Sequence, residues 1–229
     1  MRILLFGATG TAGSGVLRAC LKHPAVADLR VVSRRPLSIG DHRVRTIVHE
    51  DYLDYDRTEA AFSGVDACLW CLGISVQQVS GEPEYRRITH DFPMAAAHEL
   101  RRTSPTAVFH YLSGDRAGLD SRFMWARVKA ETERDLAAVM STVCWRPGFI
   151  DGGAEQRGPA LYRAMGPLIR PFRFIRSIYV ASEDIGWAML QAVADNRRSG
   201  ILDNRQIRDM ADRARPVAAQ QAKAQVIQR

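Results

Sequence analysis

The sequence predicts an α/β fold, a doubly wound parallel sheet flanked by helices, with a small irregular C-terminal cap. Short apolar runs alternate with segments of helical periodicity, which is the pattern of βαβ units around a parallel sheet. The first run, Ile3–Phe6, is followed at once by the glycine-rich stretch Gly7–Gly13 and then by a helical pattern. At 229 residues the chain suits one such domain, 1–229, with 151–180 as a substrate-side cap and 209–229 as a peripheral tail.

Further apolar runs predict the remaining strands. They are short and contain many β-branched and aromatic side chains, which favours strands over buried helices. These strands are expected at Leu29–Ser33, Val44–Val48, Val65–Leu72, Thr106–Leu112 and Thr142–Trp145, with a shorter one at Ser177–Val180.

Helical periodicity separates these runs. After the glycines, Val16 and Leu17 are followed at helical spacing by Cys20 and Leu21, and further helices are expected over Glu84–Arg101, Arg122–Met140 and Glu183–Ala194. Pro93 lies inside the first of these three helices and predicts a kink or a break. Ser182 is expected to cap the last of them, which has acidic residues at its start.

Composition indicates a cytoplasmic protein. The apolar run at the N-terminus ends at Gly7 and the run Ala67–Val76 is interrupted, so we expect neither a secretory signal nor a membrane span. The net charge of +7 is compatible with nucleic-acid binding. However, the arginines are scattered and no aromatic-rich basic motif accompanies them, so nucleic acid is not an expected partner.

The four cysteines, Cys20, Cys68, Cys71 and Cys144, all lie in apolar segments. This placement is typical of reduced core residues. Cys68 and Cys71 have C-x-x-C spacing, but residues three apart in a strand face opposite sides of the sheet. We therefore predict no metal site.

A strand, a glycine turn and a helix, in this order, form the arrangement that binds a pyrophosphate. Glycine lets the backbone turn sharply and come close to the phosphates. The N-terminus of the following helix presents free N–H groups and a partial positive charge. The sequence therefore predicts a nucleotide site at Gly7, Thr9, Gly10, Thr11 and Gly13.

The end of the second strand indicates which dinucleotide is bound. An acid about 20 residues beyond the glycines binds a ribose 2′-hydroxyl, whereas an arginine there suits a 2′-phosphate. Here Ser33, Arg34 and Arg35 occupy that place. NADP(H) is therefore expected, in preference to NAD(H), unless the two arginines are merely solvated loop charges. Asp51, after the third strand, either approaches the adenine or is a loop acid.

An ordered set of motifs carries a family resemblance. It comprises GATGTAG at Gly7–Gly13, SRR at Ser33–Arg35, CLG at Cys71–Gly73, YLSGDRAG at Tyr111–Gly118, WARVK at Trp125–Lys129 and RPGFIDG at Arg146–Gly152. From Met1 to about Asp209 the chain resembles the short-chain dehydrogenase/reductase superfamily, in its extended or atypical branch. It is most similar to small Tat-interacting-protein-like and sugar-nucleotide-epimerase-like members.

The resemblance implies a Rossmann-like fold and additional cofactor contacts from Cys71, Leu72, Gly73, Lys129, Arg146, Pro147 and Gly148. It also implies chemistry by Ser, Tyr and Lys, in which the Tyr exchanges a proton with the substrate oxygen. Ser113 and Lys129 stand at the positions of the family's Ser and Lys. The position four residues before Lys129 holds Trp125 in place of the Tyr.

Trp125 cannot replace the tyrosine, because an indole N–H is only a donor and does not titrate near neutral pH. Tyr111, His110, Asp115 and Tyr85 are alternative acids. The sequence therefore leaves open an oxidoreductase with a relocated acid, a dinucleotide-binding redox sensor or partner-binding module without turnover, and isomerase or lyase chemistry with tightly held nucleotide. It names no small-molecule substrate and leaves homo-oligomerisation open.

Overall fold

A computed structural model describes residues 1–153, 171 and 173–227, and only the backbone of 219–227. In these residues seven strands form one parallel sheet in the order β3-β2-β1-β4-β5-β6-β9. The strands are β1 (Arg2–Phe6), β2 (Asp28–Ser33), β3 (Val44–Val48), β4 (Ala67–Trp70), β5 (Val108–Leu112), β6 (Thr142–Arg146) and β9 (Gly200–Asp203). The strand order reverses its direction between β1 and β4, which confirms the doubly wound α/β class.

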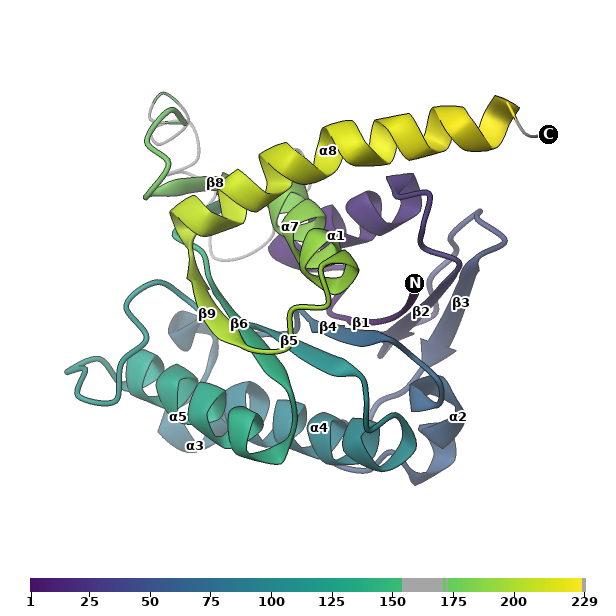
Figure 1. The fold of residues 1–229 in the computed structure, drawn as a ribbon. Coiled ribbons are helices and arrows are strands. Elements are labelled where there is room, and N and C mark those ends of the chain that lie inside the picture. The colour runs from purple at the N-terminus through teal and green to yellow at the C-terminus, as the bar shows by residue number, and fades with distance from the viewer. Residues whose placement is uncertain (154–170, 172, 228–229) are drawn as a thin grey trace.

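Helices cover both faces of this sheet (Figure 1). On one face lie α1 (Thr11–Lys22), α7 (Ser182–Ala194) and α8 (Asn204–Ile227). On the other lie α2 (Glu59–Phe62), α3 (Glu82–Arg86), α4 (Phe92–Thr103) and α5 (Met124–Val139). Short 3₁₀ turns occupy Asp56–Thr58 and Val76–Gln78, and β7 (Phe149–Asp151) pairs with β8 (Tyr179–Ala181) in a separate two-stranded sheet.

The side chains of β1 alternate between two buried cores. Ile3 and Leu5 pack with residues of α1 and α7, whereas Leu4 and Phe6 pack with residues of α4. Because both faces of a parallel sheet are covered, its strands are continuously apolar. Cys68 in β4 and Cys71 directly after it belong to different cores, as their spacing predicts.

Two glycines allow α1 and α7 to approach closely. A Cβ on Gly15 would lie 2.3 Å from the carbonyl carbon of Ser182, and one on Gly186 would lie 2.6 Å from Cβ of Ala19. The prediction that Ser182 caps α7 is wrong, because Ala181 holds the cap position and Ser182 is the first helical residue. Its hydroxyl accepts a hydrogen bond from Arg18 instead, at 3.3 Å.

The predicted helix Glu84–Arg101 is interrupted, as Pro93 indicates. A π-helical turn, Arg87–Asp91, joins α3 to α4, and Pro93 lies in the first turn of α4. The carbonyl of Thr89 in this turn accepts hydrogen bonds from the hydroxyls of Tyr111 (3.1 Å) and Thr132 (3.3 Å). Side chains of β5 and α5 thus bond to a carbonyl of the wider turn.

Several other strand and helix boundaries differ from the prediction. The strands β7 and β9 were not expected, and β4 is shorter than the predicted Val65–Leu72. Most of the predicted cap, at 154–170 and 172, lies outside the described residues.

The expected peripheral tail from 209 onward forms part of α8, which contains Pro216. Asp203 begins this helix with a capping box, in which its carboxylate and the side chain of Gln206 bond to each other's backbone N–H at 2.9 Å.

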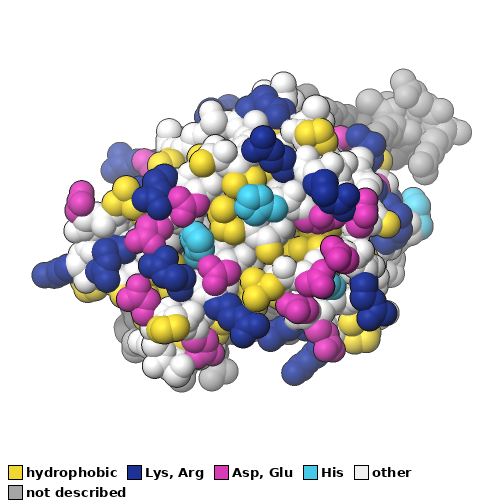
Figure 2. All heavy atoms as spheres, turned by 90° about the horizontal axis from the view of Figure 1, so that it is seen from below, with side chains coloured by type: hydrophobic (Ala, Val, Ile, Leu, Met, Phe, Trp, Pro, Cys, Tyr) yellow, Lys and Arg dark blue, Asp and Glu magenta, His cyan; other side chains and the backbone are white. Residues whose placement is uncertain are grey.

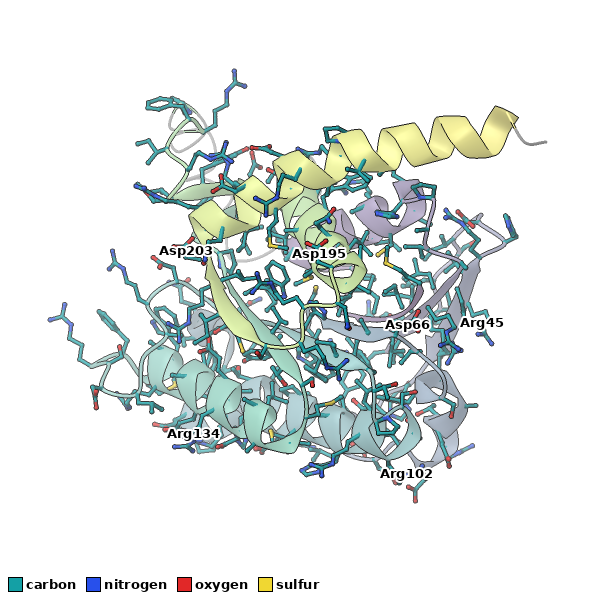
Figure 3. The ribbon with its side chains drawn as sticks, viewed as in Figure 1. Arg45, Asp66, Arg102, Arg134, Asp195 and Asp203 are labelled. Carbon is teal, nitrogen blue, oxygen red and sulfur yellow. The ribbon has the colours of Figure 1, made fainter. Side chains whose placement is uncertain are left out.

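Surface charges of both signs are intermingled on the face formed by the helices below the sheet (Figure 2). Arg102 and Arg134 project outward from α4 and α5, and Arg45 from the edge strand β3 (Figure 3). Arg102 pairs with Glu99 at 2.8 Å, and Arg45 pairs with Asp28 at 2.6 Å. Among the described residues, no helix has the length and apolar character that a membrane span requires, and no cluster of three potential metal ligands occurs.

Candidate functional site

A cavity of about 510 Å³ opens at the carboxyl ends of β1, β2 and β4. This is the point at which the strand order reverses, where ligands bind in open α/β sheets. Nine predicted cofactor residues line it: Gly7, Thr9, Gly10, Ser33, Arg34, Arg35, Cys71, Leu72 and Gly73. Ala8, Val32, Pro36, Leu37 and Tyr52 also line it and were not predicted.

The three glycines of the turn have different roles. Gly7 has a φ of +75°, and a Cβ there would lie 2.6 Å from the backbone of Cys71 and Leu72. A Cβ on Gly13 would lie 2.0 Å from the carbonyl oxygen of Gly7, so Gly13 permits the helix to pack against the turn. Gly10 lines the cavity, and the nearest atom to a Cβ there is 3.4 Å away. Gly10 is therefore the position where a side chain would fill ligand space without disturbing the turn.

Arg34 and Arg35 are exposed at the end of β2. Neither forms an ion pair with another described residue, so both guanidinium groups are available to an anion. Ser33 accepts a hydrogen bond from the backbone N–H of Arg35 at 3.3 Å and thereby shapes the loop.

Asp51 is exposed and its carboxylate accepts a hydrogen bond from the backbone N–H of Leu53 at 3.0 Å. It does not line the cavity, whereas its neighbour Tyr52 does. An aromatic residue in the loop that follows the third strand was the signal that could have identified Tyr52, because a ring can stack on a nucleobase.

A second group of predicted residues lies at the carboxyl end of β5, the strand next to β4. The hydroxyl of Ser113 is buried and has no hydrogen-bond partner among the described residues. Lys129 on α5 is half-buried, and its Nζ donates to the carbonyl of Ser113 at 2.9 Å and to that of Leu112 at 3.4 Å. The ring of Trp125 and the side chain of Lys129 both flank Gly114. They lie 3.6 Å and 3.5 Å from the position that a Cβ on Gly114 would take.

None of the four alternative acids occupies the position of Trp125 beside Lys129. Tyr111 is buried, and its hydroxyl donates to the carbonyl of Thr89 in the π-helical turn. His110 is fully buried with its ring stacked on Trp145, and Asp115 is exposed beside Arg116. Tyr85 is buried in α3.

The predicted residues at the end of β6 make internal contacts. Arg146 forms an ion pair with Glu133, with Nε 2.9 Å from the carboxylate, and Glu133 is buried on α5 four residues after Lys129. The carbonyl of Pro147 accepts a hydrogen bond from the N–H of Asp115 at 3.0 Å, and the N–H of Gly148 donates to Asn204 at 2.8 Å. These residues hold together the loops beside Ser113, and the i, i+4 spacing to Lys129 was the signal for Glu133.

Comparison with known proteins identifies the family. No protein-family model matches the chain. Protein fmp52-1, mitochondrial, of Aspergillus oryzae is 30% identical over 162 residues, which cover 68% of this chain and 68% of that protein. The chain belongs to the fmp52 family. Protein HTATIP2 of Rattus norvegicus is 26% identical to this fmp52-family chain over 166 residues, which cover 71% of the chain and 68% of the rat protein.

A solved structure supports the fold. MoeE5 in complex with UDP-glucose and NAD has a TM-score of 0.63 and 19% identity, covering 88% of this chain and 75% of that chain. With HTATIP2, this places the chain among the atypical short-chain dehydrogenases/reductases, as the motifs indicated. The cytoplasmic location expected from composition is contradicted, because the fungal relatives are named mitochondrial.

Proposed function

We propose that the protein binds NADP(H) and is an oxidoreductase of the atypical short-chain dehydrogenase/reductase type with a non-standard active site. The observation that carries the cofactor proposal is the cavity at the ends of β1, β2 and β4, which is lined by Arg34 and Arg35. Neither guanidinium group forms an ion pair with another residue that the structure describes. The residues fit the dinucleotide, because the glycine turn leaves open space beside Gly10. MoeE5, whose complex contains NAD, has the same fold.

Each part of the cofactor has residues suited to hold it. The turn at Gly7–Gly10 and the N-terminus of α1 suit the pyrophosphate. Arg34 and Arg35 suit a 2′-phosphate, since guanidinium pairs with phosphate in a fork geometry. The buried hydroxyl of Ser113, which lacks a partner in the described structure, suits a substrate oxygen. When bound, the nicotinamide supplies the two-electron redox chemistry.

The competing function is a dinucleotide-binding redox sensor without turnover. The observation that favours it is Trp125, which flanks Gly114 beside Lys129. In the sequence it stands four residues before Lys129, where the resemblance implies a tyrosine. A sensor would bind the cofactor as tightly as an enzyme but would not consume it in the presence of carbonyl compounds.

The first test measures affinity for the two cofactors by fluorescence titration. We expect NADPH to bind at least tenfold more tightly than NADH, a difference of about 1.4 kcal/mol. The double variant Arg34→Ala/Arg35→Ala should lose most of this preference. Arg101→Ala/Arg102→Ala on α4 removes the same charge far from the cavity and should retain it. Equal affinities for NADPH and NADH in the unaltered protein would refute the assignment of the 2′-phosphate site.

The second test distinguishes enzyme from sensor. Purified protein is mixed with NADPH and a panel of aldehydes, ketones and quinones, and the loss of NADPH absorbance is followed. Reduction of at least one panel member supports the enzyme. Tight NADPH binding without any reduction supports the sensor.

A further inference from the structure

Lys129 is the titratable side chain that the described structure places against Ser113. Its Nζ donates to two main-chain carbonyls, Leu112 and Ser113, and an ammonium group has three N–H donors. One N–H therefore remains for another acceptor. The carbonyl and the unpartnered hydroxyl belong to the same residue, Ser113, so an oxygen bound by that hydroxyl lies close to Nζ.

Among the residues that the structure describes, the side chains beside Lys129 offer no other proton donor that titrates near neutral pH. Trp125 lies next to Lys129 over Gly114, and its indole cannot exchange a proton near neutral pH. The hydroxyl of Tyr111 bonds to Thr89, while the Tyr111 ring contacts the lysine, with Nζ 5.7 Å from its centroid. The ring thus borders the ammonium group while the hydroxyl is directed to the π-helical turn.

The composition of the chain adds an independent observation. Only three of its 32 basic residues are lysines, Lys22, Lys129 and Lys223, and arginine holds every other basic position. Arginine does not release its proton in proteins, whereas a buried lysine does so readily. The chain thus keeps an amine at the position beside Ser113.

We propose that Lys129 is the catalytic proton donor of this protein. It takes the role that a tyrosine has in the short-chain dehydrogenase/reductase superfamily. The inference rests on the proposed oxidoreductase function. In the net reaction a substrate carbonyl is reduced to an alcohol and NADPH is oxidised to NADP⁺, with uptake of one proton. That proton passes from Nζ of Lys129 to the substrate oxygen held by Ser113. The resulting neutral amine is reprotonated from solvent.

The electrostatic surroundings suit this role. Burial lowers the pKa of Lys129 to about 8, and the negative charge of Glu133 on the same helix opposes that shift. Glu133 is itself paired with Arg146 of β6, so part of its charge is compensated. The charged residues of the adjoining β5–α5 loop, Asp115, Arg116, Asp120 and Arg122, are all exposed, and Arg86 of α3 is held by Glu131. A donor with a pKa near the working pH is the most effective general acid.

The first experiment needs no substrate. With three lysines, reductive ¹³C-methylation gives few lysine signals, and Lys129→Arg identifies the one from Lys129. We expect that signal to titrate near pH 8, well below the unperturbed lysine pKa of about 10.4. Titration at the unperturbed value would overturn the inference.

The second experiment follows NADPH-dependent reduction of the same carbonyl panel between pH 6 and 10. The protonated lysine is the active form, so kcat/KM should be level below pH 8 and fall about tenfold per pH unit above it. Lys129→Arg keeps the positive charge and should retain NADPH affinity but lose about 10²–10⁴-fold in turnover. Lys22→Arg, whose lysine pairs with Glu183 on the surface, is the matched control and should be unchanged.

Two outcomes separate the inference from the proposed function. NADPH-dependent turnover that persists in Lys129→Arg, or whose rate does not depend on pH, overturns the role of Lys129 alone. NADPH binding without turnover in the unaltered protein overturns the oxidoreductase and the inference with it, and leaves the sensor. Absence of NADPH binding overturns the proposed function and the inference with it.

Discussion

His110 shows how one buried side chain links stability to pH. It lies in the middle of β5 with no exposed surface, and its Nδ1 accepts a hydrogen bond from Nε1 of Trp145 at 3.2 Å. Burial lowers the pKa of His110 to about 3. The histidine is therefore neutral in the folded protein near neutral pH, which fits a core residue and not a proton donor.

We predict that His110 destabilises the fold in acid. Between an unfolded pKa of about 6.5 and the folded value of about 3, only the unfolded chain takes up the proton, so stability falls as pH is lowered through this window. The loss reaches about 1.4 kcal/mol per pH unit. His110→Gln keeps an acceptor for Trp145 but does not titrate. Urea unfolding of both proteins at pH 4 to 7 should give a steeper pH dependence for the parent, and parallel curves would contradict the argument.

Residue chemistry was predictable where it depends on local order along the chain. The glycine turn, Arg34 and Arg35 all line the cavity, because each follows a strand that ends at the same edge of the sheet. Arg146 illustrates the limit: it is the last residue of β6, at the same edge of the sheet, but its guanidinium pairs with Glu133, which a different element supplies. Which of two nearby anions an arginine binds depends on tertiary geometry that spacing does not contain.

At the scale of elements, strands were easier to predict than their interruptions. β2 and β3 were located almost to the residue because they are short, apolar and β-branched. β9 was missed because it is short and mostly exposed, and β7 because it directly follows the Pro147–Gly148 break. Pro93 lacks the N–H that would bond to the carbonyl of Thr89 four residues before it, and this local signal predicts an interruption. The hydroxyls of β5 and α5 that bond to this carbonyl instead come from distant elements, which no local pattern encodes.

The junction of β1 and α1 yields a prediction that separates binding from folding. Gly10→Val should remain folded, with an unfolding free energy within about 1 kcal/mol of the parent, but lose NADPH affinity at least tenfold because its methyls occupy the cavity. Gly13→Ala should instead lose about 1–3 kcal/mol of stability, because its Cβ collides with the carbonyl of Gly7. Thermal unfolding and NADPH titration of both variants measure this. Unchanged NADPH affinity in Gly10→Val would mean that the turn is structural only.

At the scale of the whole molecule, Asn204 connects segments that are distant in the sequence. It is the first residue of α8 and is 3% exposed. Its Oδ1 accepts from the N–H of Gly148 at 2.8 Å, and its Nδ2 donates to the carbonyls of Arg176 (2.8 Å) and Tyr179 (2.9 Å). One side chain therefore joins the loop after β6, the start of β8 and the last helix. Because these partners lie 25 to 56 residues away along the chain, the sequence alone did not reveal this connection.

Asn204→Asp tests whether this connection stabilises the molecule. The aspartate keeps an acceptor for Gly148, but it places a negative oxygen opposite two carbonyls that had received hydrogen bonds. The carbonyl of Arg176 then loses the donor Asn204, and that of Tyr179 keeps only the longer bond from Arg208 at 3.4 Å. Leaving buried polar groups unpaired costs about 1–3 kcal/mol each, and we expect a loss of at least about 2 kcal/mol at pH 7.

Asn196→Asp makes the same chemical change at an exposed residue with a φ of 51°, a conformation that aspartate also adopts, and should alter stability by less than about 0.5 kcal/mol. Denaturant unfolding of the two variants beside the parent gives the comparison. Equal stability of Asn204→Asp and Asn196→Asp would show that the three hydrogen bonds of Asn204 contribute nothing to holding these segments together.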